Sequence, residues 1–298
     1  MKILITGING MLGYALYRVF SVQNGYHLYG LDTKEQGSAY ELQGYARVDI
    51  TNAENVYGAV TKINPDIVIH TAAYTDVDKA ETEPDLVHKI NALGTRNVAL
   101  ACQRFDAAMV YFSTDYVFDG KLEKYQEYSV PHPLNVYGES KLQGEHYIRG
   151  LLSKFYIVRT SWLFGSNGKS FVGTILSKAV NSKSIEVVDD QTGSPTYTVH
   201  LASAVAELVG RQNPGLYGIW HITNTGSCTW YQLAEYAVKL KGINCAVMPI
   251  TTKKLNRPAV RPRVSVLENR CWRVEGFKPL PSWQDGVIDY IGEVGIDE

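Results

Sequence analysis

Short apolar segments alternate along the chain with longer segments in which apolar residues recur every three or four positions. The apolar segments, which predict strands, are residues 2–6, 27–31, 67–71, 108–113 and 155–160. The longer segments, which predict amphipathic helices, are residues 11–22, 53–63, 86–105 and 136–152. Strands that are apolar along most of their length are typical of a parallel sheet covered by helices on both faces. The pattern therefore predicts an α/β fold with a doubly wound parallel sheet.

The alternation loosens after Thr160. Helices are predicted there at about 171–180, 199–209 and 230–240, and short strands at 184–188 and 220–223. Prolines cluster further on, which is typical of a loop-rich segment. We predict one domain of residues 1–160 plus about 196–225, interlocked with a smaller C-terminal lobe of about 161–195 and 226–298.

Composition and charge exclude several classes of protein. The 298 residues are 45% hydrophobic and 20% charged, as in ordinary globular proteins. The 29 Lys and Arg residues balance 30 Asp and Glu residues, so no basic excess is available for a nucleic acid or an anionic membrane. We expect neither as a partner.

The cysteines and the apolar runs exclude further classes. The four cysteines are widely spaced, with no C-x-x-C pair, so neither a disulfide framework nor a metal site is predicted. No apolar run approaches the roughly 18 residues of a membrane span, and the N-terminus shows no signal sequence. We expect a soluble, cytoplasmic protein.

A glycine-rich loop follows the first predicted strand and opens the first helix. Its sequence, Gly7-Ile8-Asn9-Gly10-Met11-Leu12-Gly13, has the form G-x-x-G-x-x-G. Glycines let the backbone turn tightly and approach a pyrophosphate, which then faces the free amides at the helix N-terminus. We assign Gly7, Asn9, Gly10, Met11, Leu12 and Gly13 to cofactor binding in a Rossmann-type domain. The alternative is a turn that only permits tight packing of strand and helix.

Acidic residues follow the next strands. Asp32 stands 19 residues after Gly13 (32 − 13), close to the spacing of about 20 expected for a carboxylate on the adenosine ribose. Such a carboxylate repels a 2′-phosphate, so NADH is favoured over NADPH, although Lys34 tempers that preference. Asp49 and Ile50 are assigned to the adenine site. An Asp49 that caps the following helix is the alternative.

A tyrosine and a lysine lie four residues apart on one face of the predicted helix 136–152. These are Tyr137 and Lys141, and the strand before that helix ends at Ser113 and Thr114, at the sheet edge where ligands bind. We expect the ammonium of Lys141 and an oxidised nicotinamide ring to lower the pKa of Tyr137 from about 10, so that the phenol acts as an acid or base. A surface pair without chemistry is the alternative.

Together these residues resemble a known superfamily. Gly7, Gly10, Gly13, Asp32, Ala72, Ala73, Asn91, Thr114, Tyr137 and Lys141 are typical of the extended short-chain dehydrogenases/reductases. The stretches that resemble its dTDP-4-dehydrorhamnose reductase branch are 72–81 (AAYTDVDKAE), 113–120 (STDYVFDG), 133–138 (PLNVYG), 159–162 (RTSW), 190–196 (DQTGSPT), 261–267 (RPRVSVL) and 280–283 (LPSW). The resemblance covers nearly the whole chain.

The resemblance implies an NAD(P)H-dependent reduction of the C4 ketone of dTDP-4-dehydro-6-deoxy-L-mannose to dTDP-L-rhamnose. It implies that Thr114 hydrogen-bonds the C4 carbonyl oxygen, that Tyr137 donates the proton, and that Lys141 holds the nicotinamide ribose. Two hydroxyls aimed at an oxygen that gains negative charge stabilise it, in agreement with these roles.

Further residues receive roles from the same resemblance. Ala72 and Ala73 join the cofactor site. Thr114, Asp115, Tyr116 and Trp162 form the substrate site, and the C-terminal lobe would bind the sugar nucleotide. Trp162 would stack on the thymine ring, and a core aromatic is the alternative. The sequence is compatible with a homodimer.

Some positions depart from the family pattern, and rival functions stay open. His70 stands where the family commonly has Asn, and Ile8 and Met11 replace commoner loop residues. A 4,6-dehydratase would carry Asp-Glu after Thr114, whereas this chain has Asp115-Tyr116. We also consider a retained-cofactor epimerase, a reductase of another nucleotide-bound 4-keto-6-deoxy sugar, and a non-catalytic regulatory subunit such as that of methionine adenosyltransferase. The complete set of proton-transfer residues favours an enzyme.

Overall fold

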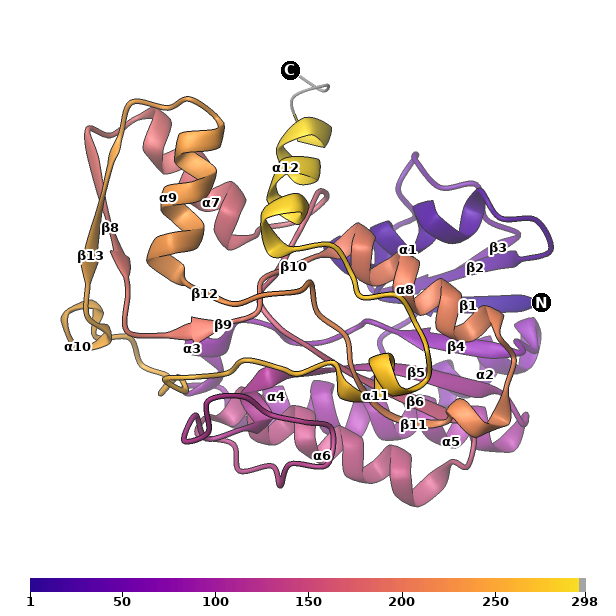
Figure 1. The fold of residues 1–298 in the computed structure, drawn as a ribbon. Coiled ribbons are helices and arrows are strands. Elements are labelled where there is room, and N and C mark those ends of the chain that lie inside the picture. The colour runs from indigo at the N-terminus through magenta and orange to yellow at the C-terminus, as the bar shows by residue number, and fades with distance from the viewer. Residues whose placement is uncertain (295–298) are drawn as a thin grey trace.

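A seven-stranded parallel sheet forms the centre of the protein, as the computed structural model, which describes residues 1–294, shows (Figure 1). The strands are β1 Lys2–Thr6, β2 His27–Asp32, β3 Gly44–Arg47, β4 Ile67–His70, β5 Ala108–Thr114, β6 Phe155–Thr160 and β11 Gly218–His221. Their order across the sheet is β11-β6-β5-β4-β1-β2-β3. From β1 the chain adds strands first on one side, β2 and β3, and then on the other, β4, β5 and β6. Ligands of such sheets bind at the carboxyl ends of the strands beside this switch between β1 and β4.

Helices cover both faces of the sheet (Figure 1). The helices of one face are α1 Met11–Ser21, α8 Thr198–Gly210 and α11 Arg270–Val274, and those of the other are α2 Ala53–Ile63, α5 Thr95–Arg104 and α6 Val136–Leu151. Each face has its own apolar core, because alternate residues of the buried strands point to opposite sides. The predicted doubly wound α/β fold is confirmed.

The chain between β4 and α5 differs from the single helix predicted over 86–105. It forms two short helices, α3 Val77–Ala80 and α4 Pro84–His88, and then a π-helical segment, η1 Lys89–Gly94. The π-helix contains Asn91, whose side chain is fully buried and bonds to Tyr74 and Ser140. Strand β3 was not predicted, because the short edge segment Gly44–Arg47 carries no apolar run.

The second part of the chain forms a smaller layer beyond the carboxyl edge of the sheet. Its elements are β7 Leu163–Phe164, α7 Phe171–Val180, β8 Ser184–Val188, β9 Thr192–Gly193, β10 Thr196–Tyr197, β12 Cys228–Thr229, α9 Trp230–Leu240, β13 Ala246–Ile250, α10 Thr252–Leu255 and α12 Trp283–Val294. The tail predicted to be loop-rich contains four regular elements, β13, α10, α11 and α12, and residues 256–269 and 275–282 between them form loops with isolated β-bridges only. Proline at 249 is tolerated because β13 pairs with β8 alone.

Two elements of the second half return to the sheet. Helix α8 packs on α1, and β11 pairs in parallel with β6. The remaining short elements are the 3₁₀ turns η2 Asp115–Val117 and η3 Pro214–Leu216. The boundaries predicted for the two interlocked domains stay a prediction. Among the helices of residues 1–294, none combines the length and the apolar character that a membrane crossing requires.

Candidate active site

A cavity of about 780 Å³ opens at the carboxyl edge of the sheet and contains most of the predicted site. The predicted residues that line it are Gly7, Asn9, Gly10, Met11, Leu12, Asp32, Asp49, Ile50, Ala72, Ala73, Thr114, Asp115, Tyr116, Tyr137, Lys141 and Trp162. They come from the last residues of β2 and β5, from the segments that follow β1, β3, β4, β5 and β6, and from α1 and α6. The topology brings them together because parallel strands end at the same edge.

In the glycine loop the backbone passes very close to the segment that follows β4. Gly7 has φ +68°, and a Cβ at that position would lie 2.6 Å from the Ala72 amide nitrogen, so only glycine fits. Gly13 is not among the residues that line the cavity, and its assignment to cofactor binding stays a prediction. A Cβ there would lie 2.4 Å from the Gly7 carbonyl oxygen. Gly13 therefore allows α1 to pack tightly behind the loop.

Asp32 lines the cavity and also holds the glycine loop. Its carboxylate accepts hydrogen bonds from the backbone amides of Asn9, at 3.0 Å, and Lys34, at 3.1 Å. Asp49 also lines the cavity, and its carboxylate accepts from the Thr51 amide. The N-cap of α2 is Asn52 rather than Asp49. The helix-cap alternative for Asp49 is therefore wrong.

His70 ends β4 under the cavity and is fully buried. Its Nδ1 lies 2.6 Å from the Thr6 hydroxyl and its Nε2 lies 3.1 Å from the Thr95 hydroxyl. Burial, together with the charge of Lys141, lowers the pKa of His70 to about 3. The histidine that departs from the family pattern is thus a neutral link between β1, β4 and α5.

Thr114 and Asp115 lie at the end of β5 and face the cavity while almost fully buried. The Thr114 hydroxyl donates to Asp115 Oδ1 at 3.1 Å and accepts from the Tyr116 amide at 3.1 Å. Burial raises the pKa of Asp115 to about 7, against hydrogen bonding by Ser265 and Thr114. Its Oδ2 has no protein partner among the described residues. Asp115 Oδ2 is therefore free for a ligand, whereas the Thr114 hydroxyl has to exchange its bond to Asp115 Oδ1 in order to donate to one.

Tyr137 begins the first turn of α6, which Asn135 caps by accepting from the Gly138 amide at 2.8 Å. Burial raises the pKa of the Tyr137 phenol, and the nearby Asp115 raises it further, while the Thr114 hydroxyl opposes this. The lowering expected from Lys141 together with an oxidised nicotinamide ring concerns the complex with the cofactor, and it stays a prediction. Lys141 is itself buried, which disfavours its charged form.

Lys141 lies one turn after Tyr137, with only 4% of its surface exposed. Its Nζ lies 4.2 Å from the centre of the Tyr111 ring. Burial lowers the pKa of Lys141 to about 7, and Glu145 opposes the shift. The carboxylate of Glu145 is held by the guanidinium of Arg159 at 2.9 and 2.7 Å. A buried ion pair therefore lies directly beneath the lysine.

Trp162 lines the cavity, but its ring already has an aromatic partner. The indole stacks on Trp230, with the ring centres 3.4 Å apart and the planes 6° apart. Gly193 lies against the same indole, where a Cβ would be 2.4 Å from Cε2. Trp162 is partly exposed, which differs from a fully buried core residue. Stacking on a nucleobase stays a prediction.

Several cavity residues were missed by sequence reasoning. They are Thr71, Thr75, Thr160, Ser161, Asn167, Gly168, Lys169 and Trp230, among others. Asn167 also donates to the Asn9 carbonyl oxygen at 3.1 Å, so the segment before α7 contacts the glycine loop. Thr160 could have been predicted from the sequence, because its strand ends at the same edge of the sheet as the strand of Thr114. No pattern in the sequence points to Trp230.

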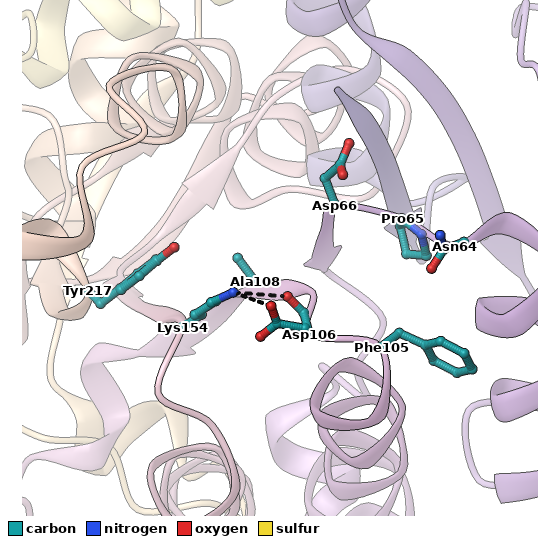
Figure 2. A pocket seen from close by; sticks show the side chains of 8 residues that line it. All are labelled: Asn64, Pro65, Asp66, Phe105, Asp106, Ala108, Lys154 and Tyr217. Carbon is teal, nitrogen blue, oxygen red and sulfur yellow. Dashed lines mark hydrogen bonds and ion pairs between the residues drawn. The ribbon is translucent and has the colours of Figure 1, made fainter.

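A second cavity, of about 360 Å³, lies at the opposite edge of the sheet (Figure 2). It is lined by residues just before β4, β5, β6 and β11, including Asp66, Asp106 and Lys154. Lys154 and Asp106 point toward each other there and form an ion pair at 2.6 Å (Figure 2). No predicted site residue lies in it.

Known proteins share the sequence and the fold of this chain. The sequence model of the family described as RmlD substrate binding domain matches residues 1–296. A dTDP-4-dehydrorhamnose reductase of Streptomyces griseus is 39% identical over 96% of this chain and 91% of its own. A dTDP-4-keto-6-deoxy-D-glucose reductase of Streptomyces niveus is 33% identical over 99% of this chain and 98% of its own. The crystal structure of dTDP-4-dehydrorhamnose reductase from Bacillus anthracis in complex with NADP is 40% identical, with a TM-score of 0.90 over 98% of this chain and 99% of that one.

Proposed function

The chain belongs to the RmlD substrate binding domain family, and from this premise we propose that it is a dTDP-4-dehydrorhamnose reductase. It would reduce the C4 ketone of dTDP-4-dehydro-6-deoxy-L-mannose with NADH or NADPH, giving dTDP-L-rhamnose. The observation that carries the proposal is that one cavity contains both the glycine loop and the set Thr114, Tyr137 and Lys141. A non-catalytic nucleotide-binding protein would need only the glycine loop.

The residues of the cavity fit a nicotinamide dinucleotide. The close contact of Gly7 with Ala72 leaves no room for a side chain, and Gly10, Met11 and Leu12 line the cavity at the start of α1. The unpaired amides at a helix N-terminus suit a pyrophosphate. Asp32 would hold the adenosine ribose, and Lys141 the nicotinamide ribose. When bound, NADH or NADPH supplies the hydride that reduces C4.

Tyr137 and Thr114 complete the reduction at the carbonyl oxygen. Burial raises the pKa of Tyr137, so its phenol is protonated before the reaction and can act as an acid. The Thr114 hydroxyl hydrogen-bonds the same oxygen, and Tyr137 transfers its proton to that oxygen as negative charge develops there. One hydride on carbon and one proton on oxygen give the alcohol.

The cofactor preference is a finer proposal. Asp32 lines the cavity with a carboxylate that no residue neutralises by an ion pair within the described chain. A carboxylate there repels a 2′-phosphate, so we propose that NADH is preferred. We also keep the homodimer and the cytoplasmic location as predictions. Light scattering of the purified protein tests the first.

The decisive experiment is an assay that follows the oxidation of NADH or NADPH by the fall in absorbance of the reduced nicotinamide. We expect turnover with dTDP-4-dehydro-6-deoxy-L-mannose. The matched comparison is dTDP-4-keto-6-deoxy-D-glucose, because a relative named for that substrate is similar over the full chain. Preference for the second sugar, or for UDP or GDP counterparts, would identify a different reductase. Binding of nucleotide without turnover of any keto-sugar would support a regulatory subunit instead.

A further inference from the structure

Thr160, the last residue of β6, carries a hydroxyl that the protein itself does not use. The residue lines the large cavity and is only 4% exposed. Within residues 1–294, its Oγ1 has no hydrogen-bond partner. A buried hydroxyl without a partner destabilises a protein, so its presence at a cavity wall points to a ligand group that completes the bond.

The sheet places this hydroxyl beside the reacting centre. Strands β5 and β6 are parallel neighbours, and their register sets Thr160 directly opposite Thr114. Across the carboxyl edge, the order of the strands runs from β2, which ends at Asp32, through β1, β4 and β5 to β6. A dinucleotide with its adenosine ribose at Asp32 and its other ribose at Lys141 therefore has its nicotinamide at the β5–β6 end.

We propose that the Thr160 hydroxyl binds the carboxamide of the nicotinamide ring and so sets the orientation of that ring. This inference rests on the proposed function and assigns a further cofactor-binding residue to it. A carboxamide has both a donor and an acceptor, and a hydroxyl can pair with either. A ring held in one orientation presents one face, and hence one hydrogen of C4, to the substrate.

The position of Thr160 favours the cofactor over the sugar nucleotide. Thr160 is still paired within the central sheet, at the base of the cavity. The chain leaves the sheet only after it, where Trp162 adopts φ +49° and β7 pairs with β10 of the smaller layer. Trp162, which would stack on the base of the sugar nucleotide, follows Thr160 at the point where the chain passes into that layer.

The test replaces Thr160 by valine, which has the same shape without the hydroxyl. We expect the Kd for NADH, measured by fluorescence titration or calorimetry, to rise roughly three- to tenfold, the effect of one neutral hydrogen bond. The Kd for ADP-ribose, which lacks the nicotinamide ring, and the Kd for dTDP should not change. Thr160→Ser, which keeps the hydroxyl, should restore most of the affinity for NADH.

Stability provides a second readout that a structural role would not produce. Because the hydroxyl is buried and unpaired, Thr160→Val should have a Tm equal to or above that of the unmodified protein. The matched control is Ser194→Ala. The Ser194 hydroxyl is also buried and unpaired among the described residues, but Ser194 does not line the cavity. That variant should keep or raise the Tm with no change in any Kd.

Three results would overturn the proposal. The first is an unchanged Kd for NADH in Thr160→Val, and the second is an equal rise for ADP-ribose, which would place the effect at the ribose or diphosphate. The third is a selective rise for dTDP, which would assign the hydroxyl to the sugar nucleotide. If valine prevents folding, Thr160→Ala is tested in the same way, by its Kd values for NADH, ADP-ribose and dTDP relative to those of the unmodified protein. These are binding measurements without turnover, so a failed reductase assay would leave them interpretable.

Discussion

At the scale of single residues, Tyr137 is surrounded so that its phenol stays protonated. Burial and the nearby Asp115 both raise its pKa. A reductase needs a phenol that is protonated when the reaction starts and that loses its proton only as the substrate oxygen gains negative charge. A positive charge that forms beside the phenol during the reaction lowers the cost of that loss.

The first prediction is that Tyr137→Phe lowers kcat by about 10²–10⁴, the usual contribution of general acid catalysis, while the Kd for NADH stays the same. The ring remains, so its edge contact with Tyr116, at 6.2 Å between centres, should persist. Steady-state kinetics and cofactor titration check both parts. Wild-type turnover in this variant would show that another group donates the proton.

Asp32 combines two functions that one substitution cannot separate. Its carboxylate accepts from the amides of Asn9 and Lys34, and it is also the expected ribose ligand. We predict that Asp32→Ala weakens NADH binding about tenfold or more, the scale of a hydrogen bond to a charged group. Any preference for NADH over NADPH should narrow in titrations with both cofactors.

The control for that prediction is Asp32→Asn. Asparagine keeps one oxygen, which can accept from the Asn9 amide or the Lys34 amide but not from both, and it removes the charge that repels a 2′-phosphate. NADPH affinity should therefore gain relative to NADH, with one loop bond kept. Equal affinities for both cofactors in the unmodified protein and in both variants would show that Asp32 serves the loop alone.

At the scale of elements, the reacting residues depend on how α6 is held against the sheet. Tyr137, Lys141 and Glu145 follow at intervals of four residues, so they share one face of the helix. Glu145 accepts from Arg159 of β6 and from Ser113 of β5, the latter at 2.5 Å. A buried ion pair that loses one partner costs about 3–5 kcal/mol, so this link fixes α6 firmly.

The contact between Trp162 and Trp230 joins the end of the sheet to helix α9. We predict that Trp162→Ala raises the KM for the sugar nucleotide roughly ten- to hundredfold, because stacking on a base contributes about 1–3 kcal/mol. NADH binding should barely change. Loss of the stack on Trp230 should also lower the free energy of unfolding by ~0.5–1.5 kcal/mol.

Melting temperature and kinetics together decide the role of Trp162. A loss near 3–5 kcal/mol with an unchanged KM would indicate a core residue instead. Trp162→Phe is the conservative variant, and it should recover part of the KM because it keeps a ring. Substrate and cofactor constants are measured in the same preparations.

At the scale of the whole molecule, ion pairs tie the C-terminal segment to the first half of the chain. Arg257 and Arg261 follow α10, and both donate to the carboxylate of Asp78 in α3, at 2.9 and 2.8 Å. Asn135, which caps α6, donates to the nearby Val260 carbonyl oxygen at 2.8 Å. The segment therefore closes over the helix that carries Tyr137.

These bonds make stability depend on pH. Partial burial would raise the pKa of Asp78, but hydrogen bonds from Arg261 and Arg257 outweigh it and lower the pKa from 3.8 to about 2. A carboxyl with a depressed folded-state pKa stabilises the fold above its unfolded value, and this is lost as the pH falls toward the folded value. We predict that Asp78→Asn is about 2 kcal/mol less stable at pH 7.

The same variant should lose its disadvantage in acid. Between about pH 4 and pH 2 the unmodified protein loses the contribution of Asp78, so the two unfolding free energies should converge. Urea unfolding at a series of pH values checks this. The control is Asp106→Asn, because the Asp106 carboxylate is 84% exposed and its pair with Lys154 should contribute little. A constant difference at all pH values would contradict the assignment to charge.

Much of the architecture was readable along the chain. The five buried strands and the helices 53–63, 171–180 and 230–240 follow from local periodicity, which the core imposes on neighbouring residues. The glycine loop, Thr114, Tyr137 and Lys141 could be placed in one cavity because parallel strands end at one edge. The elements missed, such as β3 and β13, are short, lie at sheet edges or contain proline, and so carry little periodic signal.

Other features depend on contacts between distant segments. The raised pKa of Tyr137 comes from burial and from Asp115, and the face of Trp162 is occupied by Trp230, which no spacing in the sequence relates to it. Gly13 lies too close to the Gly7 carbonyl oxygen to carry a side chain, and the Thr160 hydroxyl is left without a protein partner among the described residues. Local pattern determined which residues form the sheet edge. Burial and charge at that edge were decided by tertiary packing, because both depend on what the rest of the chain places around each group.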